Sequence, residues 1–173
     1  MVRSFVARGV SVCCFLLYPL MCVLGDPFLQ VSVTPDAQLV SEEESVCGLR
    51  LCLPYGRNAS VTGLDGGFVT ETVDEANALQ FSAIGNFVEQ NGTGLQFGLF
   101  NSVGNEMAGG QVGGFFNSAN KFGGIGIAGG VNRYSEGKGI LLAGCGNIGE
   151  VLKGAQISLF NVSTYSSGLQ VGL

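Results

Sequence analysis

The chain has 173 residues, a length typical of one domain, and a formal net charge of -5. It is 46% hydrophobic and only 12% charged, and it has no basic cluster that would neutralise phosphates, which excludes a nucleic-acid partner. Histidine is absent, so the commonest general base and the commonest metal ligand are both missing. We therefore expect a protein that is not an enzyme and that holds neither a cofactor nor a metal ion.

Residues 1–25 have the pattern of a secretory signal peptide. Arg3 and Arg8 precede an apolar stretch, and Val23 and Gly25 occupy the −3 and −1 positions of a cleavage before Asp26. The apolar stretch is about 16 residues long, shorter than the roughly 20 that a membrane-spanning helix needs. The sequence therefore predicts export to the cell surface, outer membrane or periplasm, with an uncleaved membrane anchor as the alternative.

Residues 26–45 are predicted to lead into a repeat domain that spans 46–173. Residues 28–33 alternate between apolar and polar types and fit a short strand, after which Pro35 and a run of acids interrupt the pattern.

Three cysteines lie beyond the expected cleavage site. Cys47 and Cys52 are candidates for a disulfide, because exported proteins occupy oxidising compartments. Cys145 has no evident partner and is expected to be a small buried side chain rather than a reactive thiol.

The sequence from 46 onward repeats with a period of about 15 residues, the signature of a solenoid, propeller or array. The clearest units are GLQFGLFN at 94–101 and GAQISLFN at 154–161. One column of the repeat is Asn, at Asn86, Asn101, Asn117, Asn132, Asn147 and Asn161. Another is Gln, at Gln80, Gln96, Gln111, Gln156 and Gln170. Gly126 and Leu141 take the Gln position in two units, and Arg50 and Asp65 continue the column backwards.

The segment GCGNIG at 144–149 also matches the GxGxxG fingerprint of a dinucleotide-binding turn. Its residues lie on the repeat, since Asn147 belongs to the Asn column. A fingerprint should be followed about 20 residues later by an acid for the ribose hydroxyl, and no acid follows Glu150. The sequence therefore favours another repeat unit here, without a nucleotide site.

Two all-β architectures fit one strand and one turn per unit. In a β-solenoid of about nine units, each unit is one coil and equivalent residues stack about 4.8 Å apart. In an antiparallel meander or outer-membrane-type barrel, each unit is one strand. Because strands of about eight residues are short for spanning strands of about 9–11, the β-solenoid is the predicted fold.

The period-2 alternation of the unit predicts what each face of the strand does. One face of an extended chain carries Leu95, Phe97, Leu99 and Asn101, and the other carries Gly94, Gln96, Gly98 and Phe100. We expect Leu and Phe columns to fill the interior, and the Asn and Gln columns to form side-chain hydrogen-bond ladders.

The tandem Gly-Leu-Gln-x-Gly-Leu-x-Asn units behind an export signal resemble a family of bacterial surface-repeat proteins. The resemblance covers roughly 46–173 and is most specific at 94–101, 154–161 and 168–173. It implies a repeat fold and a location at the envelope or surface, but no activity, and it carries over no catalytic residue.

The favoured function is that of a non-enzymatic, exported repeat protein of the cell envelope with a structural or interaction role. The Gln column is a candidate interaction ladder for an unknown protein or glycan, unless its amides merely satisfy one another; the Asn column is expected to be structural. A membrane-embedded, barrel-like outer-membrane protein is the alternative, and an enzyme is a third. An uncapped solenoid end exposes strand edges, so we also expect self-association through the C-terminal edge.

Overall fold

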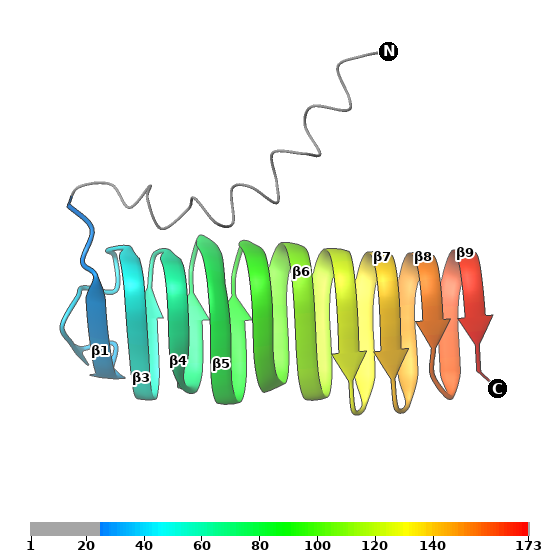
Figure 1. Ribbon diagram of the computed structural model, residues 1–173, viewed down its shortest axis with the longest axis horizontal. Coiled ribbons are helices and arrows are strands. Elements are labelled where there is room, and N and C mark those ends of the chain that lie inside the picture. The colour runs from blue at the N-terminus through cyan, green and yellow to red at the C-terminus, as the bar shows by residue number, and fades with distance from the viewer. Residues whose placement is uncertain (1–24, 173) are drawn as a thin grey trace, which may run out of the picture.

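The structure is a computed structural model that describes residues 25–172, and this part of the chain consists of strands and turns without a helix. It forms a β-solenoid of about eight turns, which confirms the predicted fold (Figure 1). The strands are β1 (Leu29–Thr34), β2 (Ala37–Gln38), β3 (Val46–Asn58), β4 (Val61–Thr72), β5 (Glu75–Val88), β6 (Asn91–Ala128), β7 (Val131–Ala143), β8 (Gly146–Ile157) and β9 (Phe160–Val171).

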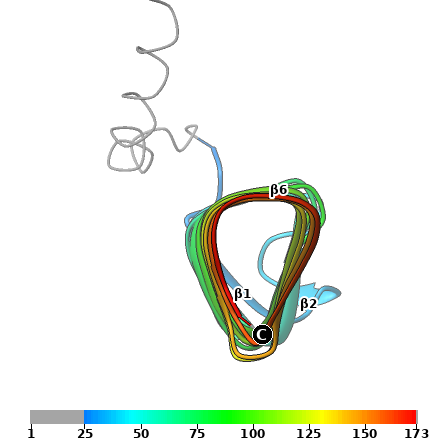
Figure 2. The same cartoon turned by 90° about the vertical axis from the view of Figure 1, so that its right-hand side faces the viewer.

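Successive coils lie side by side in parallel. Gly48 pairs with Gly63, Leu79 with Leu95, and Gly139 with Gly154, so the register advances by about one repeat per layer. Each coil follows a rounded triangular path, and the coils superimpose when viewed along the long axis (Figure 2). The antiparallel meander or barrel is therefore wrong, because from β3 onward neighbouring strands of the described chain run in the same direction.

The solenoid begins before the predicted domain boundary at 46. β1 pairs in parallel with β3, with Gln30 beside Arg50, so part of the expected leader is the first layer of the stack. The short β2 folds back against β1 in the antiparallel direction. The expected signal peptide at 1–25 lies, apart from Gly25, outside the described residues.

Glycine opens every repeat from Gly48 onward except the one that begins at Ala78, and these glycines have backbone angles that favour glycine. Gly94 and Gly109 have φ angles of 119° and 133°, a region that other residues rarely adopt. A Cβ atom on Gly94 would also lie 2.3 Å from the carbonyl oxygen of Ala78 in the preceding coil. The backbone angle and the close stacking of coils thus both select glycine at this position.

The expected distribution of polar and apolar side chains is inverted. The Gln and Asn columns point inward and are buried up to the last coil, whereas Leu95 is 42% exposed and Phe81 is 49% exposed. The prediction that Leu and Phe columns of the repeat fill the interior is therefore wrong. Amide side chains that bond to one another from coil to coil occupy these inward positions instead.

Apolar packing inside the solenoid comes from two other columns. Val103 and Met107 are buried in one coil, and Phe122 and Tyr134 occupy equivalent space further along, where their rings stack with centroids 4.2 Å apart.

Residues 140–152 form the end of β7, a bend and the start of β8. They are a repeat unit and not the strand and helix of a dinucleotide-binding fold.

The predicted disulfide between Cys47 and Cys52 is wrong, because Cys52 is a free thiol. Both residues lie on β3, and five steps of about 3.3 Å along an extended strand separate their Cα atoms by about 16 Å, beyond the reach of a disulfide. Burial raises the pKa of the Cys52 thiol. Cys145 is exposed at the bend between β7 and β8, so its predicted burial is also wrong.

Candidate functional site

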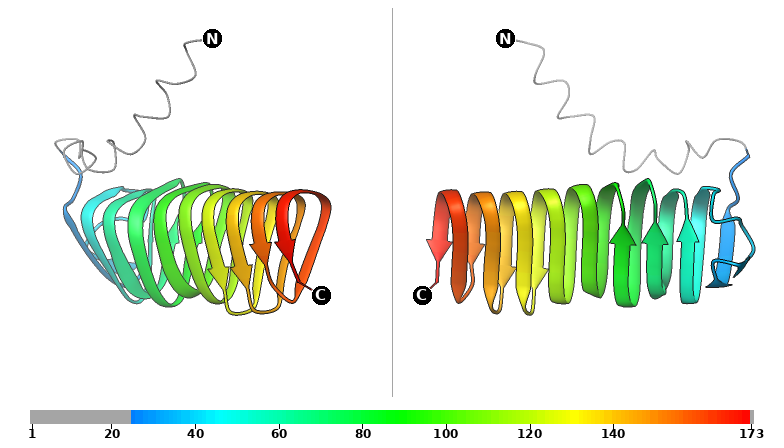
Figure 3. Two further views of the ribbon diagram at one scale, coloured as in Figure 1. Left: turned by 45° about the vertical axis from the view of Figure 1, so that its right-hand side comes forward. Right: turned by 180° about the vertical axis from the view of Figure 1, so that it is seen from behind.

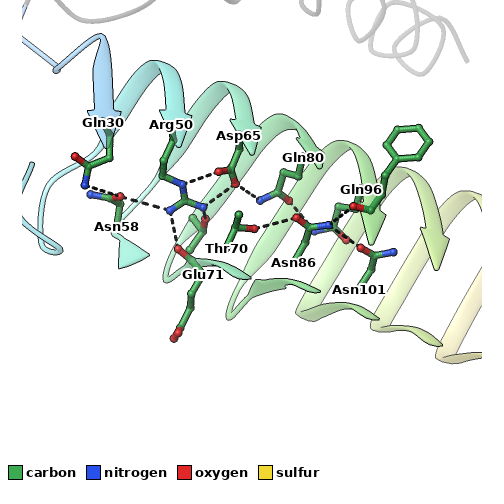
Figure 4. Close-up of polar contacts among 12 residues, drawn as sticks. Gln30, Arg50, Asn58, Asp65, Thr70, Glu71, Gln80, Asn86, Gln96 and Asn101 are labelled. Atoms are coloured by element: carbon green, nitrogen blue, oxygen red, sulfur yellow. Dashed lines mark hydrogen bonds and ion pairs between the residues drawn. The ribbon is translucent and has the colours of Figure 1, made fainter. Parts of the chain in front are cut away.

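The Gln column forms a directed hydrogen-bond ladder inside the solenoid. Each amide donates from Nε2 towards the N-terminal end, over 2.8 Å from Gln111 to Gln96 and over 2.8 Å from Gln96 to Gln80. The ladder ends where Gln80 donates to the carboxylate of Asp65 (Figure 4). Gln80, Gln96 and Gln111 are at most 1% exposed, so these candidate interaction residues have no accessible surface.

The Asn column forms a second ladder that runs in the opposite direction. Asn86 donates from Nδ2 to Oδ1 of Asn101 over 2.8 Å, and the same bond repeats towards the C-terminal end at Asn117, Asn132, Asn147 and Asn161. The second Nδ2 proton bonds a backbone carbonyl of the next coil, as from Asn86 to Phe97. The amide dipoles of the two ladders therefore point in opposite directions, and the Asn column also fastens the strand that follows each bend.

A buried ion pair closes the Gln ladder at its N-terminal end. Arg50 Nε and Nη2 donate to the two carboxylate oxygens of Asp65 over 2.8 and 2.7 Å. Arg50 also donates to the Thr72 hydroxyl and to the carbonyl oxygen of Glu71. Although burial favours loss of its charge, the Asp65 carboxylate raises the pKa of Arg50 above its ordinary value. The guanidinium of Arg50 therefore stays charged, and its donors are satisfied inside the fold.

The Gln ladder is interrupted at the two units where the sequence departs from Gln. Tyr134 replaces the missing amide at Gly126, because its hydroxyl donates to Oε1 of Gln111 over 2.9 Å. A Cβ atom on Gly126 would lie 2.8 Å from that hydroxyl, so the glycine makes room for it. At Leu141 nothing accepts a hydrogen bond, and Nε2 of Gln156 is buried without a partner. Gln170, exposed on the last coil, donates to Gln156 over 3.2 Å.

The solvent-accessible candidate site is an uninterrupted apolar surface on one side of the triangular solenoid. It consists of the outward side chains of two neighbouring columns, and we call it the apolar face. The Leu95 column comprises Leu29, Leu49, Leu64, Leu79, Leu95, Gly110, Ile125, Ile140, Ala155 and Leu169. The Phe97 column comprises Val31, Leu51, Gly66, Phe81, Phe97, Val112, Ile127, Leu142, Ile157 and Val171. The coils stack along the long axis of the molecule (Figure 3), and register neighbours on successive coils therefore form columns along that axis.

Side chains of the apolar face pack along their columns yet remain half open to solvent. The rings of Phe81 and Phe97 stack with centroids 4.9 Å apart and planes 11° apart. Ile125 is 49% exposed and Ile140 is 44% exposed although they are neighbours in register. Lys138 and Lys153 flank the face across Gly139 and Gly154.

Charged groups lie on the other sides of the solenoid. A hollow of about 280 Å³ is lined by Glu106, Lys121, Phe122, Gly123, Glu136, Gly137, Lys138, Val151 and Lys153. Lys121 and Glu136 are neighbours in register, so opposite charges alternate there as on an ordinary solvated surface.

The N-terminal coils carry a surface cluster that the sequence did not indicate. Arg57 lies 3.1 Å from the carboxylate of Glu89 and 3.3 Å from that of Glu71, and its hydrogen bond to Glu89 raises the pKa of Arg57. Tyr55 donates a hydrogen bond to Glu71. These residues are spaced by about one repeat each, and that spacing was the available signal.

Within residues 25–172, the His, Cys, Asp and Glu side chains form no group of three that would hold a metal ion. The same residues contain no helix with the length and hydropathy needed to cross a membrane. Asp65 is the buried carboxylate of the described chain, and its oxygens are engaged by Arg50 and Gln80.

Comparison with known proteins finds no family model, no curated protein and no solved structure that matches this chain.

Proposed function

We propose that this protein is an exported, non-enzymatic structural or interaction protein of the cell envelope, and that the apolar face is its contact surface. The observation that carries the proposal is the apolar face itself. Monomeric soluble proteins rarely expose contiguous apolar patches of more than a few hundred Å², and larger ones mark interaction sites.

The rigidity of the surface supports the same proposal. The backbone beneath the apolar face is paired on both sides by parallel neighbours, and the two internal ladders tie each coil to the next. A stacked repeat presents an extended surface that does not need to be ordered on binding. The entropic cost of binding is therefore low for the protein itself.

The chemistry of the interior supports a structural role for the amide columns. Gln96 and Asn101 form their hydrogen bonds with amides of neighbouring coils and with backbone carbonyl groups. Of the two roles expected for the Gln column, mutual satisfaction of the amides is the one we propose. The partner then has to meet aliphatic and aromatic side chains instead of amides.

Export is proposed from the sequence, through Arg3, Arg8 and the apolar stretch up to Gly25. Cell fractionation with and without detergent extraction tests it. We expect the chain in the envelope fraction and an N-terminus at Asp26. Recovery of the intact chain in the cytosol would contradict the proposed location, and loss of the envelope location on deleting residues 1–25 would support it.

A membrane-associated role is the second candidate, and the apolar face is also the observation in its favour. A surface that enters lipid must leave no backbone group unpaired, and the strands beneath this face meet that requirement. Flotation of the purified chain with phosphatidylcholine vesicles would distinguish this role from binding to a protein.

A further inference from the structure

We infer that the occupant of the apolar face is a second copy of this chain, packed face to face. The inference deepens the proposed function and rests on the apolar face being the contact surface. Three properties of the face lead to it: its area, its freedom from charge and its flat sheet geometry.

The area of the face matches what a stable dimer needs. About ten stacked layers at about 4.8 Å make it about 43 Å long, and the five positions of each coil that carry the two columns, such as 94–98, make it about 16 Å wide. The face therefore covers about 700 Å², close to the roughly 800 Å² per partner of a standard protein interface.

The chemistry of the face allows it to be buried against itself. Between Leu29 and Val171, both outward columns contain only Leu, Ile, Val, Phe, Ala and Gly. Two such faces would bury neither an unpaired charge nor an unpaired backbone group, which are the groups that make desolvation expensive. The flanking Lys138 and Lys153 would stay at the wet rim of the contact, where charged residues belong.

The geometry fits the way in which sheets pack. Two sheets stack about 10 Å apart with their strands aligned within about 30°, and side chains of the size of Leu, Ile and Phe fill that space. The exposed halves of Leu95, Ile125 and Ile140 stand at regular layer spacing and match the same spacing on the partner. A lipid surface is the competing occupant. The net charge of -5 disfavours anionic lipid and a second copy alike, so the matching layer spacing of the two faces is what favours the second copy.

Sedimentation equilibrium of the full chain and of charged variants tests the inference. The variants are Leu95→Glu/Ile125→Glu and Leu95→Lys/Ile125→Lys. The matched controls are Gln90→Glu/Asn120→Glu, two exposed positions off the apolar face with the same 30-residue separation. We expect a dimer for the wild type and for the controls. Each charged variant alone should dissociate about 100-fold more readily, because every interface would bury four like charges. An equimolar mixture of the two charged variants should recover dimers, because opposite charges then meet.

Each other outcome overturns the inference. A wild-type chain that stays monomeric at about 100 μM has no self-association of useful strength. Dimers in all variants alike would place the contact elsewhere, including the C-terminal edge. A monomer that floats with phosphatidylcholine vesicles, and loses flotation in both charged variants, would make lipid the occupant. Circular dichroism checks that the outward substitutions leave the fold intact, and fractionation tests the envelope location independently.

Discussion

Arg50 and Asp65 form a two-bonded ion pair in the interior of the solenoid, on adjacent coils, with both side chains fully buried. They occupy the column that Gln fills further along the chain. Asp65 accepts from Gln80 on its other side, so one carboxylate ends the amide ladder and neutralises the guanidinium. The pair is therefore the N-terminal anchor of the ladder rather than an isolated salt bridge.

Replacing one partner of this pair should lower the free energy of unfolding strongly, whereas replacing both should lower it less. Arg50→Gln or Asp65→Gln alone leaves one charge buried and uncompensated, which costs about 3–5 kcal/mol of unfolding free energy. The double variant R50Q/D65Q continues the Gln ladder by two rungs. We expect it to be more stable than either single variant, as measured by urea unfolding. A double variant whose loss equals the sum of the single losses would show that the two residues act independently.

The same substitution at two rungs of the Gln ladder should have opposite effects. In Gln96→Leu, Gln111 Nε2 loses its acceptor and Gln80 Oε1 loses its donor, each at about 1–3 kcal/mol. In Gln156→Leu, a buried amide nitrogen that already lacks a partner disappears, and Gln170, which loses its acceptor, is exposed and can bond water instead. We expect Q96L to be destabilised and Q156L to be neutral or stabilised by about 1 kcal/mol. Equal losses in thermal and urea unfolding would contradict the ladder as described.

The period, the strands and the stacking were predictable because parallel coils demand regular spacing. The intervals of the Asn column placed Asn101, Asn117 and Asn132 on adjacent layers, where the structure has them. The extra residue before Gly85 is absorbed by a local register shift between Phe81 and Gly85, after which the pairing resumes with Asn86 beside Asn101.

Which face points inward was not predictable from the usual burial of apolar residues. The more informative signal was how much the residue type varies within each column. A hydrogen-bond ladder needs a side chain of the same length, with the same donor and acceptor groups, on every coil, so Asn recurs unchanged. The Leu95 column tolerates Leu, Ile, Ala and Gly, as an outward surface can. Opposite charges at Arg50 and Asp65, one period apart, also pointed to paired inward side chains.

Alkaline pH should destabilise the N-terminal coils through Tyr55. Burial, with the hydrogen bond to Glu71, raises the pKa of Tyr55 to about 12 from an ordinary value of 10.0. The folded state thus favours the neutral phenol. This stabilisation is complete below about pH 10 and is lost as the pH rises towards about 12, because the unfolded chain releases its proton first. Urea unfolding across this window should show a shallower pH dependence for Tyr55→Phe than for the wild type; identical slopes would contradict the assignment.

The interruption of the Gln ladder should behave as one coupled unit. Gly126→Gln alone forces its side chain against the Tyr134 hydroxyl and Leu141, and such overpacking costs about 1–3 kcal/mol. Tyr134→Val alone removes the donor to Gln111 and leaves a cavity.

The triple variant combines these two changes with Leu141→Gln. It places amides at every rung from Gln80 to Gln170 and gives Gln156 Nε2 the acceptor that it lacks. We expect the triple variant to be more stable than the sum of its separate effects by about 2 kcal/mol in urea unfolding, because the three positions share one space and one hydrogen-bond chain. Additive effects would mean that Tyr134 fills a cavity without substituting for a rung.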